Sequence, residues 1–353
     1  MIPALLVISG AAAVRGQGAR LSPQFVSYTL GVPSSVTITE MAVPIFAFMP
    51  VTQGLTLDIG TAFASARVKS TGAQTTESTI SGLTDTQIRA TMNLGSELVI
   101  VTAGVNIPTG RSTAAPSEQS AASLIGNDFL VFPISSMGSG LGGTGGIALA
   151  RPFGDWNLGA GVSVRHAMPF DPYENPDGTK LRYAPGDEMR ARIGVDHPYG
   201  TGRASLGVTY SKFTDDKLSG SIYNTGDRLL SQGGVSNAIW GGDYMLSVWN
   251  LFRSSGTLAN GSVSGTESIT DVSAAYGLAL GGGRLEPGLN VRTWMQEDAS
   301  TSLQSTATLR YERSFGRLVM APGLGFTFGK VAAGPTETAS LTGFRAQLTF
   351  RAQ

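Results

Sequence analysis

The stretch "GDEMRARIGVDH", residues 186–197, decides the fold because its charged and apolar side chains alternate with a period of two. One parity carries the charges, on Glu188, Arg190, Arg192 and Asp196. The other parity carries Met189, Ala191, Ile193 and Val195. Successive side chains of a β-strand point to opposite faces, so this stretch predicts a strand with one charged face and one apolar face.

The composition is unusual for a soluble domain. Only 14% of the 353 residues are charged, against about a quarter in typical soluble domains. The chain has 47 glycines, about twice the average usage. Its 25 basic and 25 acidic residues balance, which argues against a nucleic-acid partner. The absence of cysteine from the sequence excludes disulfides and thiolate metal sites.

The N-terminal residues have the features of an export signal. Residues 2–14, "IPALLVISGAAAV", form an apolar run of signal-peptide length that is too short to span a bilayer as a helix. A basic segment before the run is missing, so we predict a signal peptide over residues 1–19 whose start is truncated. A buried N-terminal helix or strand is the alternative. Residues 20–353 contain no linker-like segment and predict a single domain.

The period of two recurs along the whole chain. It is clear in "LTLDIGTAF" (55–63) and "WNLGAGVSVR" (156–165), where each apolar side chain alternates with a small or polar one. Apolar residues with helical spacing do not recur after residue 20. The chain is therefore expected to be all-β.

Short and long connections alternate between these strands. A transmembrane antiparallel up-and-down β-barrel has this pattern, with short periplasmic turns and long outer loops. We predict such a barrel of about 14–16 strands in the bacterial outer membrane. The short turns are expected at 51–54, 93–96, 152–155, 198–202, 281–284 and 314–317, and the long loops at 68–85, 108–143, 167–186 and 252–266.

The composition of the polar parity distinguishes a membrane barrel from a soluble sandwich. A sandwich would carry many charged residues on its solvated faces, whereas here that parity is mainly Gly, Ser and Ala with scattered charges. In a barrel the apolar parity faces lipid and the polar parity faces the lumen. The side chains predicted to face the lumen are Glu188, Arg190, Arg192, Asp196, Arg165, Arg292, Arg310, Glu312 and Arg345.

Two motifs resemble a family of outer-membrane transporters. They are "VTAGVNIPTGRS" (101–112) and "RYAPGDEMRARIGVDHP" (182–198). Both look like the hydrophobic-compound transporters of the fatty-acid and toluene type and their phenol-degradation-associated relatives. The resemblance implies passive uptake of small hydrophobic or aromatic molecules. Better-known members carry an N-terminal hatch, for which this chain leaves no room, so the pore is expected to be open or gated by loop 108–143.

Other functions find little support in the residues. The two histidines, His166 and His197, lie outside any Gly-x-Ser-x-Gly setting, and we predict no enzyme, no cofactor and no metal site. The expected partners are the lipid bilayer of the outer membrane, its assembly machinery and small solutes, with the oligomeric state left open. A general diffusion porin and a structural or adhesive barrel are the alternatives to a transporter of hydrophobic compounds.

Overall fold

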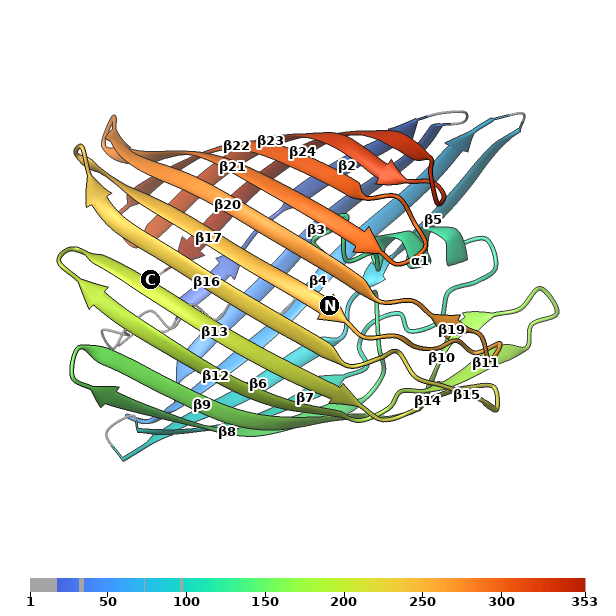
Figure 1. Cartoon of the computed structure of the whole chain (residues 1–353), viewed down its shortest axis with the longest axis horizontal. Helices are drawn as coiled ribbons and strands as arrows, with labels where there is room; N and C mark the ends of the chain where they lie inside the picture. The colour runs from blue at the N-terminus through green and yellow to red at the C-terminus, as the bar shows by residue number, and fades with distance from the viewer. Residues whose placement is uncertain (1–17, 32–34, 73, 96–97, 353) are drawn as a thin grey trace.

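The chain folds into a closed antiparallel β-barrel with one short helix (Figure 1). The computed structural model describes residues 18–31, 35–72, 74–95 and 98–352. Most of the predicted signal peptide, residues 1–17, lies outside the described residues, whereas Gly18 and Ala19 already belong to the first strand.

The barrel wall is built from strands that follow one another in the chain, so almost every neighbour is a hairpin partner. The wall strands are β1 (Gly18–Leu21), β2 (Gln24–Gly31), β3 (Ser35–Pro50), β4 (Leu55–Thr71), β5 (Thr75–Leu83), β6 (Thr86–Leu94), β7 (Val99–Ile107), β8 (Gly142–Phe153), β9 (Trp156–Ala167), β12 (Glu188–Tyr199), β13 (Gly202–Phe213), β16 (Arg228–Ile239), β17 (Gly242–Arg253), β20 (Glu267–Leu280), β21 (Gly283–Gln296), β22 (Ser302–Phe315), β23 (Leu318–Ala332) and β24 (Thr338–Ala352).

Two wall positions are occupied by interrupted strands. β1 and β2 both pair with β3 and β24, and they are separated by Ser22 and by Pro23, which has no N–H to donate to a neighbouring strand. β5 and β6 both pair with β4. With each of these pairs counted once, the wall has 16 strands, within the predicted range of about 14–16, and it closes where β1 and β2 meet β24.

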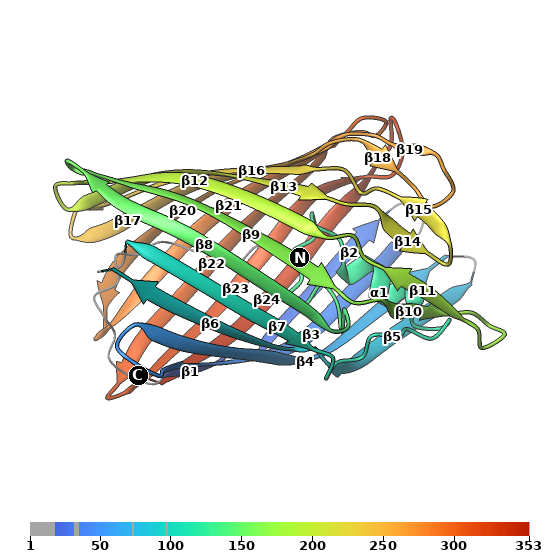
Figure 2. The same ribbon diagram turned by 90° about the horizontal axis from the view of Figure 1, so that it is seen from below.

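The two ends of the barrel differ in the length of their connections (Figure 2). Short turns join the wall strands at one end, and Gly200 and Gly316 adopt positive φ angles of 55° and 61° there. The other end carries the outer strands and the helix. These are β10 (Phe170–Glu174), β11 (Lys180–Ala184), β14 (Asp216–Leu218), β15 (Ser221–Tyr223), β18 (Gly256–Thr257), β19 (Val263–Ser264) and α1 (Gln119–Ile125).

One expected loop is wrong. Residues 68–85 are mostly strand, because β4 continues to Thr71 and β5 begins at Thr75. A membrane crossing needs only about 9–11 residues, whereas β4 has 17. The ends of β4 and β5 therefore extend past the lipid, where both faces are polar and the alternation of apolar and polar residues is lost.

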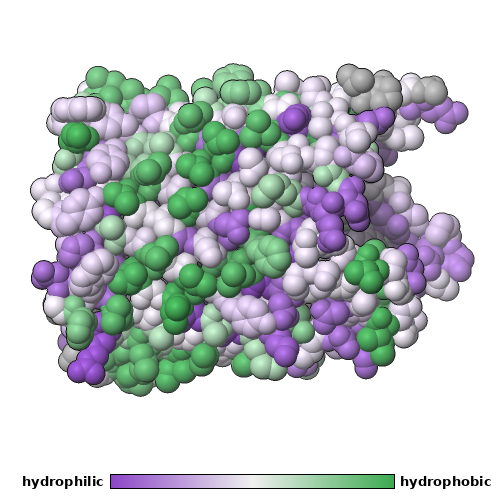
Figure 3. Space-filling view, viewed as in Figure 1, coloured by the Kyte–Doolittle hydropathy of each residue, from purple (hydrophilic) through white to green (hydrophobic). Residues whose placement is uncertain are grey.

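Large apolar side chains cover the outer surface of the wall (Figure 3). Such residues would be buried in a water-soluble protein, and contiguous exposure on this scale marks a membrane surface. Closure of the sheet leaves no unpaired edge in lipid. Within the described residues, no helix is long and apolar enough to cross a membrane. Exposed members of this surface include Ile147, Leu149, Val162, Val164, Met189, Ile193, Leu206, Leu289, Leu324 and Phe326.

Candidate functional site

The longest connection, residues 108–141 between β7 and β8, begins and ends at one buried carboxylate. Asp85 accepts hydrogen bonds from the backbone N–H groups of Gly110 (3.1 Å) and Ser139 (2.7 Å), and from the amide of Asn106 (2.8 Å). A Cβ at Gly110 would lie 2.3 Å from the carbonyl oxygen of Met137, so only glycine fits where the two ends meet. Asp85 thus closes this long connection at its base.

The first half of the connection forms α1, which packs against β3, β4 and β5. Ala121 and Ile125 are buried on its wall-facing side. The hydroxyl of Ser78 on β5 donates to the carbonyl of Ser117 (2.7 Å) and accepts from the N–H of Ala121 (3.2 Å). The helix is therefore fixed to one side of the barrel wall.

The second half, residues 126–137, crosses from α1 toward the opposite wall; we name it the crossing segment. The side-chain oxygen of Asn127 accepts from the N–H groups of Phe129 and Leu130, which tightens the turn after the helix. Phe129 is buried and stacks on Trp294 of β21, with ring centroids 5.7 Å apart. The sequence predicted a long loop here, and the structure shows that this part of it folds inward.

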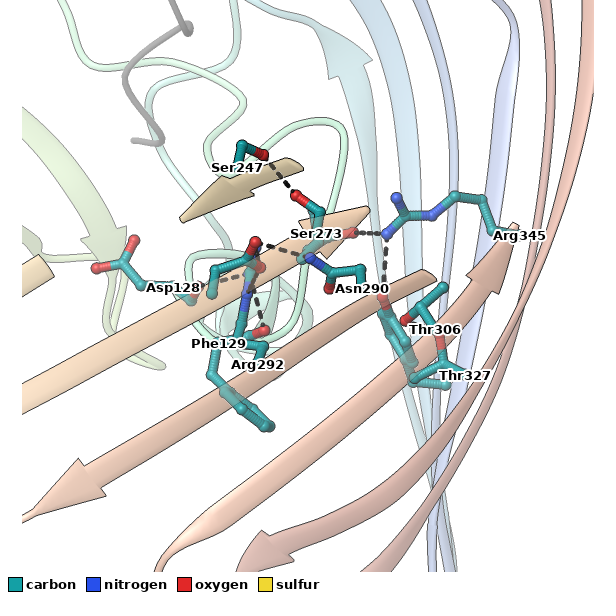
Figure 4. A network of polar contacts seen from close by, with 12 residues as sticks. Asp128, Phe129, Ser247, Ser273, Asn290, Arg292, Thr306, Thr327 and Arg345 are labelled. Carbon is teal, nitrogen blue, oxygen red and sulfur yellow. Dashed lines mark hydrogen bonds and ion pairs between the residues drawn. The ribbon is translucent and has the colours of Figure 1, made fainter. Parts of the chain in front are cut away.

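Basic side chains of the wall hold the crossing segment through its backbone carbonyls (Figure 4). Arg292 donates to the carbonyl of Phe129 (3.3 Å), and Arg345 donates to the carbonyl of Val131 (3.1 Å). Arg292 also forms a buried ion pair with Asp271 (2.8 Å). These contacts come from β20 and β21, and from β24, which closes the barrel beside β1 and β2.

An acidic side chain on β3 also holds the crossing segment. The carboxylate of Glu40 on β3 is fully buried and accepts from the N–H of Ile134 (2.9 Å). The ring of Phe132 packs edge-on against Tyr28 of β2, with centroids 5.4 Å apart. The crossing segment is thus attached to strands around much of the barrel circumference. Sequence reasoning missed Glu40 because its partner lies 94 positions away.

The charges of β12 lie on the parity opposite to the exposed Met189 and Ile193. Glu188 pairs with Arg190 at 2.6 Å and lies across from Arg165 of β9 in the strand register. Asp196, nearer the short-turn end, forms an ion pair with Arg203 of β13, and Arg192 lies between these two groups.

The remaining predicted residues belong to a row of alternating charges near the short-turn end. Arg310 pairs with Glu312 at 2.5 Å, and Arg351 pairs with the same carboxylate at 3.1 Å. Arg284 extends the row, because it forms an ion pair with Glu286. The structure therefore places the nine predicted residues in three groups, on β9 and β12, around the crossing segment, and in this row.

A small polar cavity of about 310 Å³ lies between the start of the crossing segment and the wall. Arg253 forms ion pairs there with Asp128 (2.9 Å) and with Glu267. None of these three residues was predicted, although Arg253 and Glu267 are paired in the register of β17 and β20. The cavity is lined by Gly126, Asn127, Asp128, Arg228, Arg253, Glu267 and Trp294.

The two histidines lie apart from one another. His166 pairs with Asp187 at 2.6 Å on the long-loop side. His197 stacks on Trp156, with ring centroids 4.3 Å apart, at the short-turn end. They lie at opposite ends of adjacent strands, so they do not form a common site.

The closed 16-stranded wall and its apolar outer surface define a bacterial outer-membrane β-barrel. No protein-family model and no curated protein sequence matches the chain.

Several solved outer-membrane proteins are similar in structure. OprB of Pseudomonas putida is 12% identical, with a TM-score of 0.49 over 94% of this chain and 93% of that one. OccK11 of Pseudomonas aeruginosa is 11% identical, with a TM-score of 0.48 over 95% of each chain. An anion-selective porin from Comamonas acidovorans is 14% identical, with a TM-score of 0.42 over 95% of this chain and 99% of that one. Similarity at this level concerns the fold alone.

Proposed function

We propose that this protein is a passive channel for small solutes across the outer membrane. The observation that carries the proposal is the wall of small residues on β8, β9, β12 and β13, on the side away from α1. Gly194 pairs with Gly159 on one side and with Gly207 on the other. A barrel of 16 strands is wide enough to leave an aqueous channel, and glycines on this wall keep space beside the crossing segment.

The nine predicted charged residues are proposed to line the solute path. Side chains of both signs occur along it, so we expect weak ion selectivity. Hydrophobic or aromatic solutes are the class that the sequence resemblance implies, and the charged wall favours those that also carry a polar group. Among the described residues, His166 contacts the carboxylate of Asp187 and His197 contacts a backbone carbonyl, so neither histidine is placed as the base of a nucleophile. We propose a channel without enzymatic activity.

Reconstitution of the full-length protein into planar bilayers tests the proposal. We expect stepwise conductance from the folded protein and none from a heat-denatured sample in the same detergent. Current recorded before and after adding an aromatic or a fatty-acid ligand separates a selective transporter from a general diffusion porin. A folded barrel that conducts no ions and admits no solute into liposomes would indicate a structural or adhesive role instead.

A further inference from the structure

Arg228 differs from the other charged residues around the polar cavity. It lies at the long-loop end of β16, paired in register with Arg253. Arg253 has two carboxylate partners, Asp128 and Glu267. Within the part of the chain that the structure describes, Arg228 forms no ion pair, and its buried Nε has no hydrogen-bond partner.

The contacts of Arg228 hold its guanidinium in place but do not accept a hydrogen bond from its Nε–H. The guanidinium carbon lies 4.9 Å from the ring centroid of Phe213, a cation–π arrangement. Such a contact orients the planar group but accepts none of its five N–H donors as a carboxylate would. A partly buried arginine in this state lacks an acceptor.

The carboxylates beside the cavity are already engaged. Both oxygens of Glu267 are occupied, one by Arg253 and one by the indole N–H of Trp294 (3.0 Å). Asp128 is paired with Arg253. Glu188 on the neighbouring wall is paired with Arg190. Asp216 on the outer sheet interacts with Arg228 without forming an ion pair with it, and its carboxyl accepts from the N–H of Gly186. None of the described ion pairs therefore includes Arg228, and its positive charge has no paired carboxylate.

Asn127 offers a second donor on the cavity wall. Its side-chain oxygen accepts from the N–H groups of Phe129 and Leu130, at 2.8 Å and 3.0 Å. The amide nitrogen of the same side chain is left to donate. Asn127 and Arg228 both line the cavity, one from the crossing segment and one from the barrel wall.

We propose that this cavity is a binding subsite for a small carboxylate, held by the guanidinium of Arg228 and the amide of Asn127. A carboxylate matches the fork of an arginine with two parallel hydrogen bonds. A doubly charged phosphate is disfavoured, because it would bring a second negative charge beside Asp128 and Glu267. A volume of about 310 Å³ is enough for a single-ring acid. The inference rests on the proposed channel function and names the solute group that this part of the path recognises.

The test is a binding titration of the full-length protein, folded in detergent micelles, with benzoate. Benzyl alcohol has the same ring without the charge, and propanoate has the carboxylate without the ring. We expect benzoate and propanoate to compete for one site and benzyl alcohol to leave it empty. Arg228→Gln should weaken benzoate binding about tenfold or more, since a hydrogen-bonded charge is lost.

Arg313→Gln is the matched control. Arg313 also lies over a phenyl ring, that of Phe315, but it is exposed at the short-turn end of β22 and outside the cavity, so benzoate affinity should stay within about twofold of the parent protein. Equal binding of benzoate to Arg228→Gln and to the parent would overturn the proposal. Equal binding of benzoate and benzyl alcohol to the parent would also overturn it, and this comparison needs no variant to fold.

Bilayer recordings separate this inference from the channel function. A conducting channel with no benzoate site contradicts the subsite alone. A benzoate site that needs Arg228, in a barrel that conducts nothing, contradicts the channel and leaves the subsite in place.

Discussion

Ile193 tests which face of β12 meets lipid. Its side chain is 64% exposed, near the middle of the strand. A positive charge on the lipid face at mid-membrane costs about 2–4 kcal/mol. We therefore expect Ile193→Arg to lower the fraction of folded barrel, measured by the gel mobility of unheated samples.

The matched change on the other parity is Arg190→Gln combined with Arg192→Gln. It removes two positive charges from the proposed lumen, so the barrel should assemble and its reversal potential should shift toward cation selectivity. If Ile193→Arg assembles normally while the double variant does not, our assignment of the two faces is wrong.

The ion pair between Arg292 and Asp271 is the most deeply buried one among the described residues, with side chains 7% and 3% exposed. Removal of one partner from a buried pair costs about 3–5 kcal/mol, because the other charge is left without compensation. We expect Arg292→Gln to lower the free energy of unfolding in urea by this amount. Combining it with Asp271→Asn should recover part of the loss, and no recovery would show that the carbonyl of Phe129 is the main partner.

At the scale of elements, the crossing segment is predicted to limit conductance. β7 and β8 are neighbours, with Asn106 paired to Gly142, so a short linker can replace the residues between them. Deletion of residues 112–136 should leave the barrel closed and raise single-channel conductance, since no backbone would then cross the lumen.

A deletion outside the barrel provides the comparison. Residues 258–262, at the exposed tip between β18 and β19, make no described contact with the crossing segment. Replacing them with two glycines should leave conductance unchanged. Equal conductance in the parent and in the deletion of residues 112–136 would show that this segment does not narrow the path.

The outer sheet of β10, β11, β14 and β15 has a pH dependence that follows from Asp216. Burial raises the pKa of the Asp216 carboxyl above its usual range, opposed by the N–H of Gly186 (2.6 Å), by Tyr183 and by Arg228. The folded sheet thus binds this proton more tightly than the unfolded chain does. Its stability is greatest when the carboxyl is protonated and falls as pH rises from about 4 through the raised pKa.

Limited proteolysis of the outer sheet between pH 4 and pH 8 measures this effect. Cleavage should become faster with pH in the parent protein, after correction for the activity of the protease. Asp216→Asn carries no titratable group at this position and should show a flatter profile. Identical profiles for the two proteins would contradict the prediction.

The sequence predicted the wall elements well because each wall strand repeats a local pattern. In residues 186–197 the alternation alone predicts a strand with two unlike faces. The inward fold of the crossing segment could not be predicted in this way. It depends on partners such as Glu40 and Arg345, which lie 94 and 214 positions away along the chain. The apolar run "FLVFPI" at residues 129–134 of this segment signals burial, but it does not indicate which wall residues the segment contacts.

The predicted charges illustrate the same limit at single positions. The alternation of faces along each strand selected Arg292 and Arg345 as lumen-facing. It could not indicate that both donate to carbonyls of one loop. Arg228 and Glu267 follow the same parity rule on their own strands. They were missed because they stand at strand ends, outside the alternating stretches from which the lumen-facing residues were chosen.

At the scale of the whole molecule, the topology is open to a direct test. The tip between β10 and β11, around Gly178, is exposed at the long-loop end, whereas Gly200 lies in a short turn at the other end. We expect an epitope inserted at 178 to be labelled by antibody on intact cells and one at 200 to be labelled only after the outer membrane is opened. The reverse labelling would show that the barrel has the opposite orientation in the membrane.

Closure of the wall through its first and last strands has a consequence for assembly. Ser22 and Thr349, 327 positions apart, share a buried hydrogen bond of 2.8 Å at this seam. Hairpins between neighbouring strands form from local contacts, whereas the seam has to join the most distant parts of the chain, which is slow. Until it forms, two rows of unsatisfied backbone groups face lipid. We therefore expect the seam to join last, and loss of β24 alone would leave the other strand pairs possible and the barrel open.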